Sequence, residues 1–175
     1  ALKDGDPAVG QEAAQALQKL AVGQPDAALS ARAVDLLIAA LEDGEGKARA
    51  GVAMTLGKIG NPRAVEPLIR TLKDEDAGVC EAAADALALI GDARALKPLL
   101  AALEGRRQSV RQAAAGALAK IGAPAVEPLL AVLKHSEEDV RGAAVEALVR
   151  IGAPGVRALI GALQDRDRDV RKAAA

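Results

Sequence analysis

Apolar residues recur along this chain at the spacing of amphipathic helices, at intervals of three or four residues. Val79, Ala83, Leu87 and Ile90, for example, would share one face of a helix. The segment 65–72 repeats the pattern with Val, Leu, Ile and Leu. Short polar turns separate such segments, so the pattern predicts an all-α protein.

The predicted helices come in pairs that repeat every 30 or 31 residues. An Ile-Gly dipeptide ends the first helix of each pair, at 59–60, 90–91, 121–122 and 151–152. An alanine-rich run precedes each dipeptide, at 51–58, 81–89, 112–120 and 142–150, and a second helical run follows it, at 64–69, 95–100, 125–130 and 155–160. Such a period is typical of repeat proteins, in which each pair packs on the next. We expect one domain over 1–175, with repeats at 1–43, 44–74, 75–105, 106–135 and 136–165 and a partial repeat at 166–175.

Turn residues support these helix ends. Gly60, Gly91, Gly122 and Gly152 stand where a left-handed residue closes a helix. Asp6, Asp76 and Asp167 are placed to cap first helices, with Pro7 at a first helical position. We expect Pro67, Pro98 and Pro128 in the first turn of the second helices, a mild kink being the alternative.

The first repeat carries eight extra residues, around 21–30. They form either a binding loop on a rigid scaffold or the start of a longer helix near Asp26, after Pro25. Both chain ends have the sequence of interior repeats without polar caps. The sequence therefore predicts an array uncapped at both ends, belonging to a longer array or associating end to end with its own copies.

Alanine supplies 43 of the 175 residues, and Phe, Tyr and Trp are absent. Alanine at recurring positions favours closely packed helices. Because Tyr and Trp anchors dominate strong interfaces, a surface without aromatic rings should bind a partner through charge, arginine and shape, with modest affinity.

Other function classes find little support. The net charge of −1 and the lack of aromatic rings for base stacking argue against nucleic-acid binding. No apolar run has the length of a membrane helix. We therefore expect a cytoplasmic protein that binds neither nucleic acid nor a membrane. His135 should lie exposed in a polar turn, and Cys80 takes the place of an arginine found in other repeats. The run 165–169, Asp-x-Asp-x-Asp, lacks the glycine of a calcium loop and fits helix capping better. We predict no catalytic, cofactor or metal site.

Several motifs resemble the HEAT repeat, in particular the short repeats of phycobilisome lyases and of consensus-designed helical-repeat binders. They are Asp-Val-Arg at 139–141 and 169–171, Ala-Ala-x-x-Ala-Leu at 82–87, 113–118 and 143–148, Ile-Gly-Asn-Pro-Arg at 59–63, and Ala-Val-Glu-Pro-Leu at 64–68. The resemblance covers essentially the whole chain. It implies an α-solenoid, a right-handed superhelix of about five stacked helix pairs, whose second helices line a concave face.

Outward positions of the second helices form three rows across the repeats. The first row is Asp35, Glu66, Lys97, Glu127 and Arg157; the second is Ala39, Arg70, Ala101, Ala131 and Gly161; the third is Glu42, Lys73, Glu104, Lys134 and Gln164. Charges of alternating sign in the outer rows could pair between adjacent helices and stiffen the stack. Alternatively, the small side chains of the second row leave a trough for a partner helix or peptide, into which Arg70 would reach.

The sequence therefore predicts a non-catalytic scaffold that binds a protein or peptide partner. The candidate binding residues are Asp35, Glu66, Arg70, Lys97, Ala101, Glu127, Ala131 and Arg157. Two alternatives remain, a subunit of a bilin lyase or isomerase, which the resemblance alone suggests, and a structural spacer or engineered helical-repeat scaffold.

Overall fold

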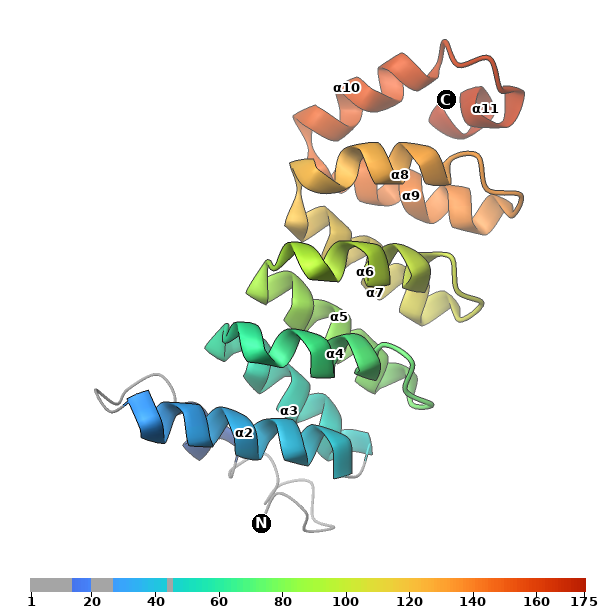
Figure 1. Cartoon of the computed structure of the whole chain (residues 1–175). Coiled ribbons are helices and arrows are strands. Elements are labelled where there is room, and N and C mark those ends of the chain that lie inside the picture. The colour runs from blue at the N-terminus through green and yellow to red at the C-terminus, as the bar shows by residue number, and fades with distance from the viewer. Residues whose placement is uncertain (1–13, 20–26, 44–45) are drawn as a thin grey trace. The chain divides into compact units, whose positions relative to one another are not determined.

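A computed structural model describes residues 14–19, 27–43 and 46–175, and every regular element in these ranges is a helix (Figure 1). The predicted all-α class is confirmed for these residues. The chain divides into two compact parts, Ala1–Ala95 and Leu96–Ala175, here called the N-terminal part and the C-terminal part. The single domain and the repeat boundaries inferred from the sequence stay predictions.

The helix bounds follow the predicted pairs closely. In the N-terminal part, residues 14–19 are helical, and the elements that follow are α2 (Ala27–Asp43), α3 (Gly46–Ile59), η1 (Pro62–Ala64), α4 (Val65–Thr71), α5 (Ala77–Ile90) and η2 (Ala93–Ala95). The C-terminal part contains α6 (Leu96–Leu103), α7 (Gln108–Ile121), η3 (Ala123–Ala125), α8 (Val126–Val132), α9 (Glu138–Ile151), α10 (Ala153–Ala162) and α11 (Arg168–Ala174). The first helices α3, α5, α7 and α9 each have 14 residues and end at the predicted isoleucine.

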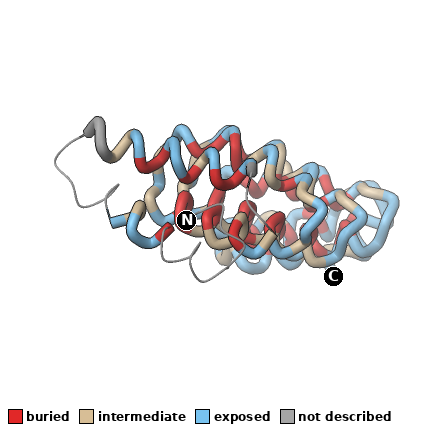
Figure 2. Tube along the Cα trace, turned by 90° about the horizontal axis from the view of Figure 1, so that it is seen from below, coloured by how far each residue is buried: buried red, intermediate tan, exposed pale blue. Residues whose placement is uncertain are grey.

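Like helices pack on like helices within each part. The first helices α3 and α5 are in contact in the N-terminal part, as are α7 and α9 in the C-terminal part, while α2 contacts α4 and α8 contacts α10. Leucines such as Leu56 and Leu118 are fully buried between the two layers, and Figure 2 shows buried residues along the inner sides of the helices. A Cβ atom at Gly57 would lie 2.6 Å from the Cα atom of Ala86. The helix backbones therefore come as close as the alanine content predicts.

The four turn glycines have positive φ angles, as predicted, but they adopt two different conformations. Gly91 is left-handed, with φ 70° and ψ 20°, whereas ψ is −136° at Gly122 and −141° at Gly152. The prediction of a left-handed residue at Gly122 and Gly152 is therefore wrong in ψ. These two glycines lie near a region of backbone space that essentially only glycine occupies.

The turns after Gly122 and Gly152 are one residue shorter than those after Gly60 and Gly91, and this explains the difference in ψ. After Gly60 and Gly91, the side chains of Asn61 and Asp92 accept hydrogen bonds from backbone N–H groups two residues on, at 3.0 and 2.9 Å. Ala-Pro follows the other two glycines, without a capping residue. Gly122 itself is then the N-cap of the next helix, so it must turn the chain directly into that helix.

The prolines lie where the sequence placed them. Pro67, Pro98 and Pro128 are the third residues of α4, α6 and α8, each after a short 3₁₀ turn. Because proline cannot donate to the carbonyl four residues earlier, the first turn winds as a 3₁₀ helix. The last complete pair has Ala158 instead of proline, and α10 is a continuous α-helix from Ala153.

The predicted N-caps of the first helices are confirmed at Asp76 and Asp167, which lie in the described ranges. The carboxylates of Asp76 and Asp167 cap α5 and α11 by accepting from Gly78 N and Asp169 N, each at 2.8 Å. Asp6 and Pro7 lie outside the described residues. For the eight extra residues around 21–30, the sequence left a choice between a binding loop and the start of a longer helix. Helix α2 starts at Ala27, so residues 27–30 are helical, as the second alternative predicts. Residues 21–26 lie outside the described ranges.

Candidate functional site

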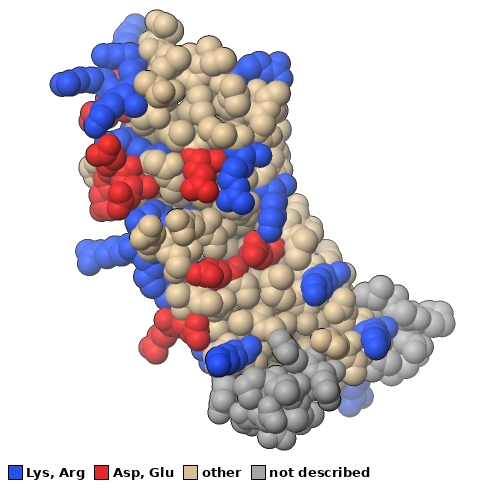
Figure 3. Space-filling model, turned by 180° about the vertical axis from the view of Figure 1, so that it is seen from behind, with Lys and Arg blue, Asp and Glu red and all other residues tan. Residues whose placement is uncertain are grey.

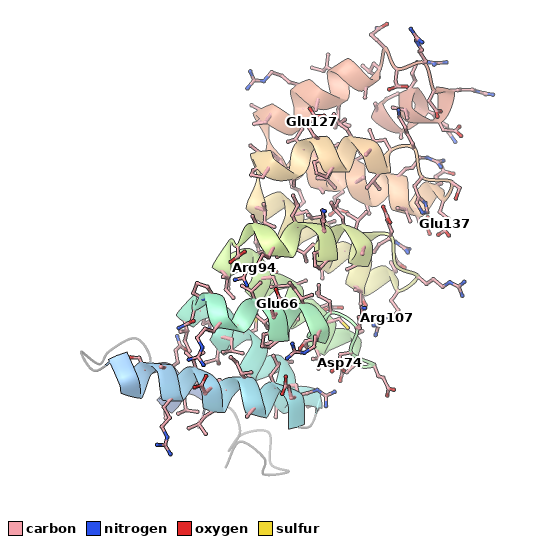
Figure 4. The ribbon with its side chains drawn as sticks, in the orientation of Figure 1. Glu66, Asp74, Arg94, Arg107, Glu127 and Glu137 are labelled. Atoms are coloured by element: carbon pink, nitrogen blue, oxygen red, sulfur yellow. The ribbon has the colours of Figure 1, made fainter. Side chains whose placement is uncertain are left out.

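All eight predicted binding residues are exposed and lie on second helices. Asp35 is on α2, Glu66 and Arg70 are on α4, Lys97 and Ala101 are on α6, Glu127 and Ala131 are on α8, and Arg157 is on α10. We call these eight residues the second-helix face and treat its two parts separately. Figure 4 labels Glu66 in the N-terminal part and Glu127 in the C-terminal part.

In the N-terminal part, internal ion pairs occupy the charged residues of the second-helix face. Asp35 lies 2.6 Å from the Arg63 guanidinium and Glu66 lies 3.7 Å from that of Arg94. Arg70 is paired with Glu42 at 2.5 Å. These pairs join a helix to the next turn or run diagonally between rows, unlike the predicted pairing along the rows.

Arg94 is held by more than one group. It donates to both carboxylate oxygens of Asp92, at 3.0 and 2.8 Å, and to the carbonyl oxygen of Pro62 at 3.1 Å. The hydrogen bonds from Arg94 to Asp92 lower the pKa of this carboxyl group to about 2. Arg94 is therefore fixed beside Glu66 and partly neutralises it.

Sequence reasoning missed Arg63 and Arg94. The signal was present, since Asn-Pro-Arg at 61–63 and Asp-Ala-Arg at 92–94 place an arginine 28 residues after Asp35 and after Glu66. The two remaining turns have proline at the corresponding position, at Pro124 and Pro154. They supply no cation to the second helix before them.

In the C-terminal part, the row charges are not paired with one another. Lys97, Glu127, Arg157 and Lys134 make no ion pair along the rows there. The Nε atom of Arg157 instead donates to the carbonyl oxygen of Ala153 on its own helix, at 3.3 Å. The predicted charge ladder is thus not formed in this part, and its charged groups face solvent.

A groove of about 530 Å³ lies between α8 and α10 on the same face. Its lining is mostly small or apolar and consists of Leu130, Ala131, Ala158, Gly161, Ala162 and Val170, with Glu127, Lys134 and Asp165 as charged members. A Cβ atom added at Gly161 would meet open space. In the C-terminal part, the surface is therefore hollowed at the second-row positions Ala131 and Gly161.

The corresponding hollow of the N-terminal part has a different character. It has a volume of about 580 Å³ and is lined by Leu41, Glu42, Arg49, Pro67, Arg70, Thr71, Lys73, Asp74 and Glu75. The Arg70–Glu42 ion pair connects α4 to α2 here, and the Arg49 guanidinium donates a hydrogen bond of 2.9 Å to the carboxylate of Asp74. Ion-paired side chains take the place of the small residues found between α8 and α10.

The arginine that ends the Asp-Val-Arg motif at 139–141, like the one at the same position in the repeat before it, is buried and holds the turn before its helix. Arg111 and Arg141 are buried and donate to the carbonyl oxygens of Gly105 and His135, six residues earlier, at 2.6 and 2.7 Å. Cys80 follows the same pattern, because its buried thiol donates to the carbonyl oxygen of Asp74 at 3.1 Å. Each of these side chains satisfies a carbonyl after the end of a second helix.

His135 and the acidic run 165–169, the other residues considered for catalysis or metal binding, make hydrogen bonds within their own turns. His135 is half-buried, not exposed as predicted, and its Nδ1 atom accepts from Glu137 N at 3.1 Å. Within the run 165–169, Asp167 caps α11, while Asp165 accepts from Asp167 N at 2.8 Å in the turn before that helix. Over the described ranges, no group of three or more His, Cys, Asp or Glu side chains is arranged to hold a metal ion. No helix among those residues has the length and apolar character needed to cross a membrane.

Charge is distributed unevenly on the opposite side of the molecule. Figure 3, which shows the back, has acidic and basic side chains in separate small groups between larger uncharged areas. The ion pairs Lys172–Glu138 and Arg150–Glu146, both at 3.3 Å, belong to the C-terminal part. No single sign of charge covers this view.

Comparison with known proteins agrees with the repeat pattern. The family model described as HEAT repeats matches residues 34–119 and again residues 96–175. A chain from the complex of CpcE and CpcF of phycocyanin lyase from Nostoc sp. PCC7120 is 31% identical, with a TM-score of 0.62 over 99% of this chain and 71% of that one. No curated protein matches the chain.

Two designed structures are also similar. An engineered protein is 25% identical, with a TM-score of 0.55 over 99% of this chain and 90% of its own. A designed armadillo repeat protein in complex with the peptide (KR)4 is 22% identical, with a TM-score of 0.54 over 99% of this chain and 93% of its own, a likeness that shows the fold alone. These relatives confirm the predicted α-solenoid class.

Proposed function

The chain belongs to the HEAT repeat family, and we propose that it is a non-catalytic scaffold whose second-helix face binds a protein or peptide segment between α8 and α10. The observation that carries the proposal is the groove of about 530 Å³ in the C-terminal part. Its floor is made of small side chains, so that a partner backbone can approach α8 and α10 closely. Specific sites on rigid helices hold their geometry better than sites on loops.

The charges beside the groove define what it would bind. Glu127 and Lys134 are seven residues apart on the α8 side, a rise of about 10 Å along a helix. Neither is neutralised by another row residue of the C-terminal part. A segment that places a cation near Glu127 and an anion about 10 Å further on satisfies both groups, while apolar side chains cover Leu130 and Ala131.

A library of 12-residue peptides displayed on phage, selected against the purified chain, supplies probes for this face. Filling the groove by Gly161→Leu should weaken the selected peptides at least tenfold, measured by fluorescence anisotropy. Gly142→Leu on α9 is the matched control, because a Cβ atom there also meets open space and Gly142 lies outside the groove. Equal affinity for the Gly161→Leu variant and the unchanged chain would show that the face is assigned wrongly.

The charges give a second, independent readout. Glu127→Lys should shift the selected peptides from cationic to anionic residues at the corresponding end. Unchanged peptide selection would mean that Glu127 does not contact the partner.

The 31% identity to a chain of the phycocyanin lyase complex over 99% of this chain favours a second candidate, a subunit of a bilin lyase. A bilin changes its visible absorption when a protein restrains it. Titration of the chain with phycocyanobilin should then change the visible spectrum with a saturable dependence on protein concentration. A spectrum identical to that of free bilin at all protein concentrations would remove this candidate.

A further inference from the structure

Another hollow of the N-terminal part is lined by first helices alone. It has a volume of about 610 Å³ and extends across α3, from the helix at residues 14–19 to α5. Its lining consists of Ala14, Gln15, Gln18, Lys47, Ala50, Gly51, Met54, Thr55, Lys58 and Ala82. Of these described residues, only the two lysines are charged, and only Met54 has a large apolar side chain. We call the ten residues the α3 hollow.

Lys47 and Lys58 contribute the charge of the α3 hollow. They are eleven residues apart in α3, which is about three helical turns, so they lie on one side of the helix with a rise of about 16 Å between them. Both residues are exposed, and neither forms an ion pair with another described residue. This spacing suits a ligand with two anionic groups about 16 Å apart better than a single small anion.

The same face of other first helices carries acids that α3 lacks. In α9, Glu146 stands at the position of Met54 and pairs with Arg150 at 3.3 Å. Arg150 in turn corresponds to Lys58. Helix α5 also has an acid, Asp85, at the position of Met54, whereas α3 contains no acidic residue. Helix α3 therefore presents a cation at each end of an otherwise uncharged face.

The lining between the two lysines leaves room for a partner. Its small residues are Ala50, Gly51 and Ala82. Gln15 and Gln18, on the helix at residues 14–19, add neutral amide groups on one side. On the other side, Ala82 belongs to α5, and the acids of α5 near it in sequence, Glu81 and Asp85, do not line the hollow. The neighbouring helices thus bring no negative charge into the lining.

We propose that the α3 hollow binds an acidic amphipathic helix of a partner protein, with carboxylates at positions i and i+11 and apolar side chains between them. Residues eleven apart lie on one side of the partner helix by the same three-turn geometry, so its carboxylates can face Lys47 and Lys58. Apolar side chains at i+4 and i+7 lie on that side too and cover Met54, whose unbranched side chain adapts to different shapes. The α3 hollow contains no residue of the second-helix face, so this inference does not rest on the function proposed above.

Three stapled, alanine-rich helical peptides test the proposal on the full chain. All have leucine at i+4 and i+7. The first carries glutamate at i and i+11, the second carries lysine at both positions, and the third has its second glutamate moved to i+9, on the opposite side of the helix. Anisotropy of a neutral dye on each peptide should show at least tenfold tighter binding of the first peptide than of the second, since two attractive pairs replace two repulsive ones. The third peptide should bind about fivefold more weakly than the first, because it has the same net charge but can pair with only one lysine.

Variants of the chain locate the binding. Lys58→Glu should weaken the first peptide at least tenfold. Lys73→Glu is the matched control, because Lys73 is an exposed lysine of the same part that does not line the α3 hollow, and it should change the affinity by less than about twofold. Met54→Glu, which gives α3 the acid that α9 has at Glu146, should pair with Lys58 and also weaken the first peptide. Since α9 accommodates glutamate at this position, the variant should keep its helical circular dichroism.

Equal affinity for the first peptide and either of the others would overturn the proposal, as would equal weakening by Lys58→Glu and Lys73→Glu. Vesicles of phosphatidylserine and phosphatidylcholine offer an anionic surface of another kind. Cosedimentation of the chain with these vesicles that is lost in Lys58→Glu, together with no binding of the first peptide, would assign the α3 hollow to an acidic membrane surface and also overturn the proposal.

Discussion

Two glycines of α10 should respond to alanine in opposite ways. A Cβ atom at Gly155 would overlap the carbonyl oxygen of Leu148 and lie 2.7 Å from its carbonyl carbon, whereas one at Gly161 would meet open space. Gly155 is the third residue and Gly161 the ninth residue of the same ten-residue helix (Ala153–Ala162). The pair therefore separates the steric effect of a methyl group from its effect on helix propensity.

The magnitudes follow from these contacts. Replacing glycine by alanine, where alanine can adopt the backbone conformation without strain, stabilises a protein by about 0.4–1 kcal/mol. At Gly155 the added atom meets backbone, which no rotamer change relieves, and overpacking of this kind costs about 3 kcal/mol. The net expectation is a loss of about 2 kcal/mol for Gly155→Ala and a gain of about 0.4–1 kcal/mol for Gly161→Ala. For a chain of this size, these values correspond to roughly 4–8 °C lower and 1–4 °C higher Tm.

Thermal unfolding followed by circular dichroism at 222 nm measures both variants against the unchanged chain. The earlier pairs have alanine at the position of Gly155, as at Ala125, where the chain forms the 3₁₀ turn η3. A Gly155→Ala variant with unchanged Tm would show that α10 can start in the same way. The expected loss of about 2 kcal/mol would then be refuted, because a rearranged helix start would avoid the contact between the methyl group and Leu148.

Three further predictions concern the turns between helices. Gly91→Asn should change the free energy of unfolding by only a few tenths of a kcal/mol, because asparagine tolerates the left-handed region. Gly122→Asn should lower it by about 1–3 kcal/mol, because Gly122 lies near a region that essentially only glycine occupies. Urea unfolding of the two variants measures the difference. The pKa of Asp92 is about 2 in the folded chain, below its ordinary value of 3.8, so its contribution to stability is present above about pH 4 and is lost as the pH falls toward 2. Asp92→Asn keeps the cap on Arg94 N and should flatten the dependence of Tm on pH in that window. Arg141→Met should cost about 2 kcal/mol in urea unfolding, because its guanidinium donates two hydrogen bonds to turn carbonyls.

The repeat period predicted the helices because each helix end is chemically marked. Isoleucine followed by glycine ends every first helix from α3 to α9, and Pro67 could only lie in a first helical turn. The angle ψ at Gly122 was not predictable from the glycine itself, because it depends on whether the next residue caps the helix. The exposure of Ile160 depends on which neighbouring helix is present, a tertiary property that helical periodicity does not contain.

The candidate site was predicted only in outline, because side-chain pairing depends on three-dimensional distances. The sequence placed the eight residues of the second-helix face on exposed helix surfaces, and the structure agrees for all of them. The sequence shows an arginine 28 residues after Asp35 and after Glu66, but this spacing alone does not show that the residues are paired. Those pairs form because a residue before one second helix lies beside the preceding second helix, and a sequence alignment of repeats shows positions but no such distances.

The length of the turn connects the fold to the candidate site. Where the turn has an Asn or Asp cap followed by arginine, the glycine need not cap the helix, and the arginine pairs with Asp35 or Glu66 of the second helix before it. Where one residue is deleted and Ala-Pro follows, as after Gly152, the glycine must cap the next helix and no arginine is supplied. The same deletion therefore sets the unusual ψ angle and leaves Glu127 without a turn arginine beside the groove. Inserting Asp-Ala-Arg in place of Ala153-Pro154 should consequently pair Glu127 and weaken binding in the groove, although the inserted arginine lies outside it.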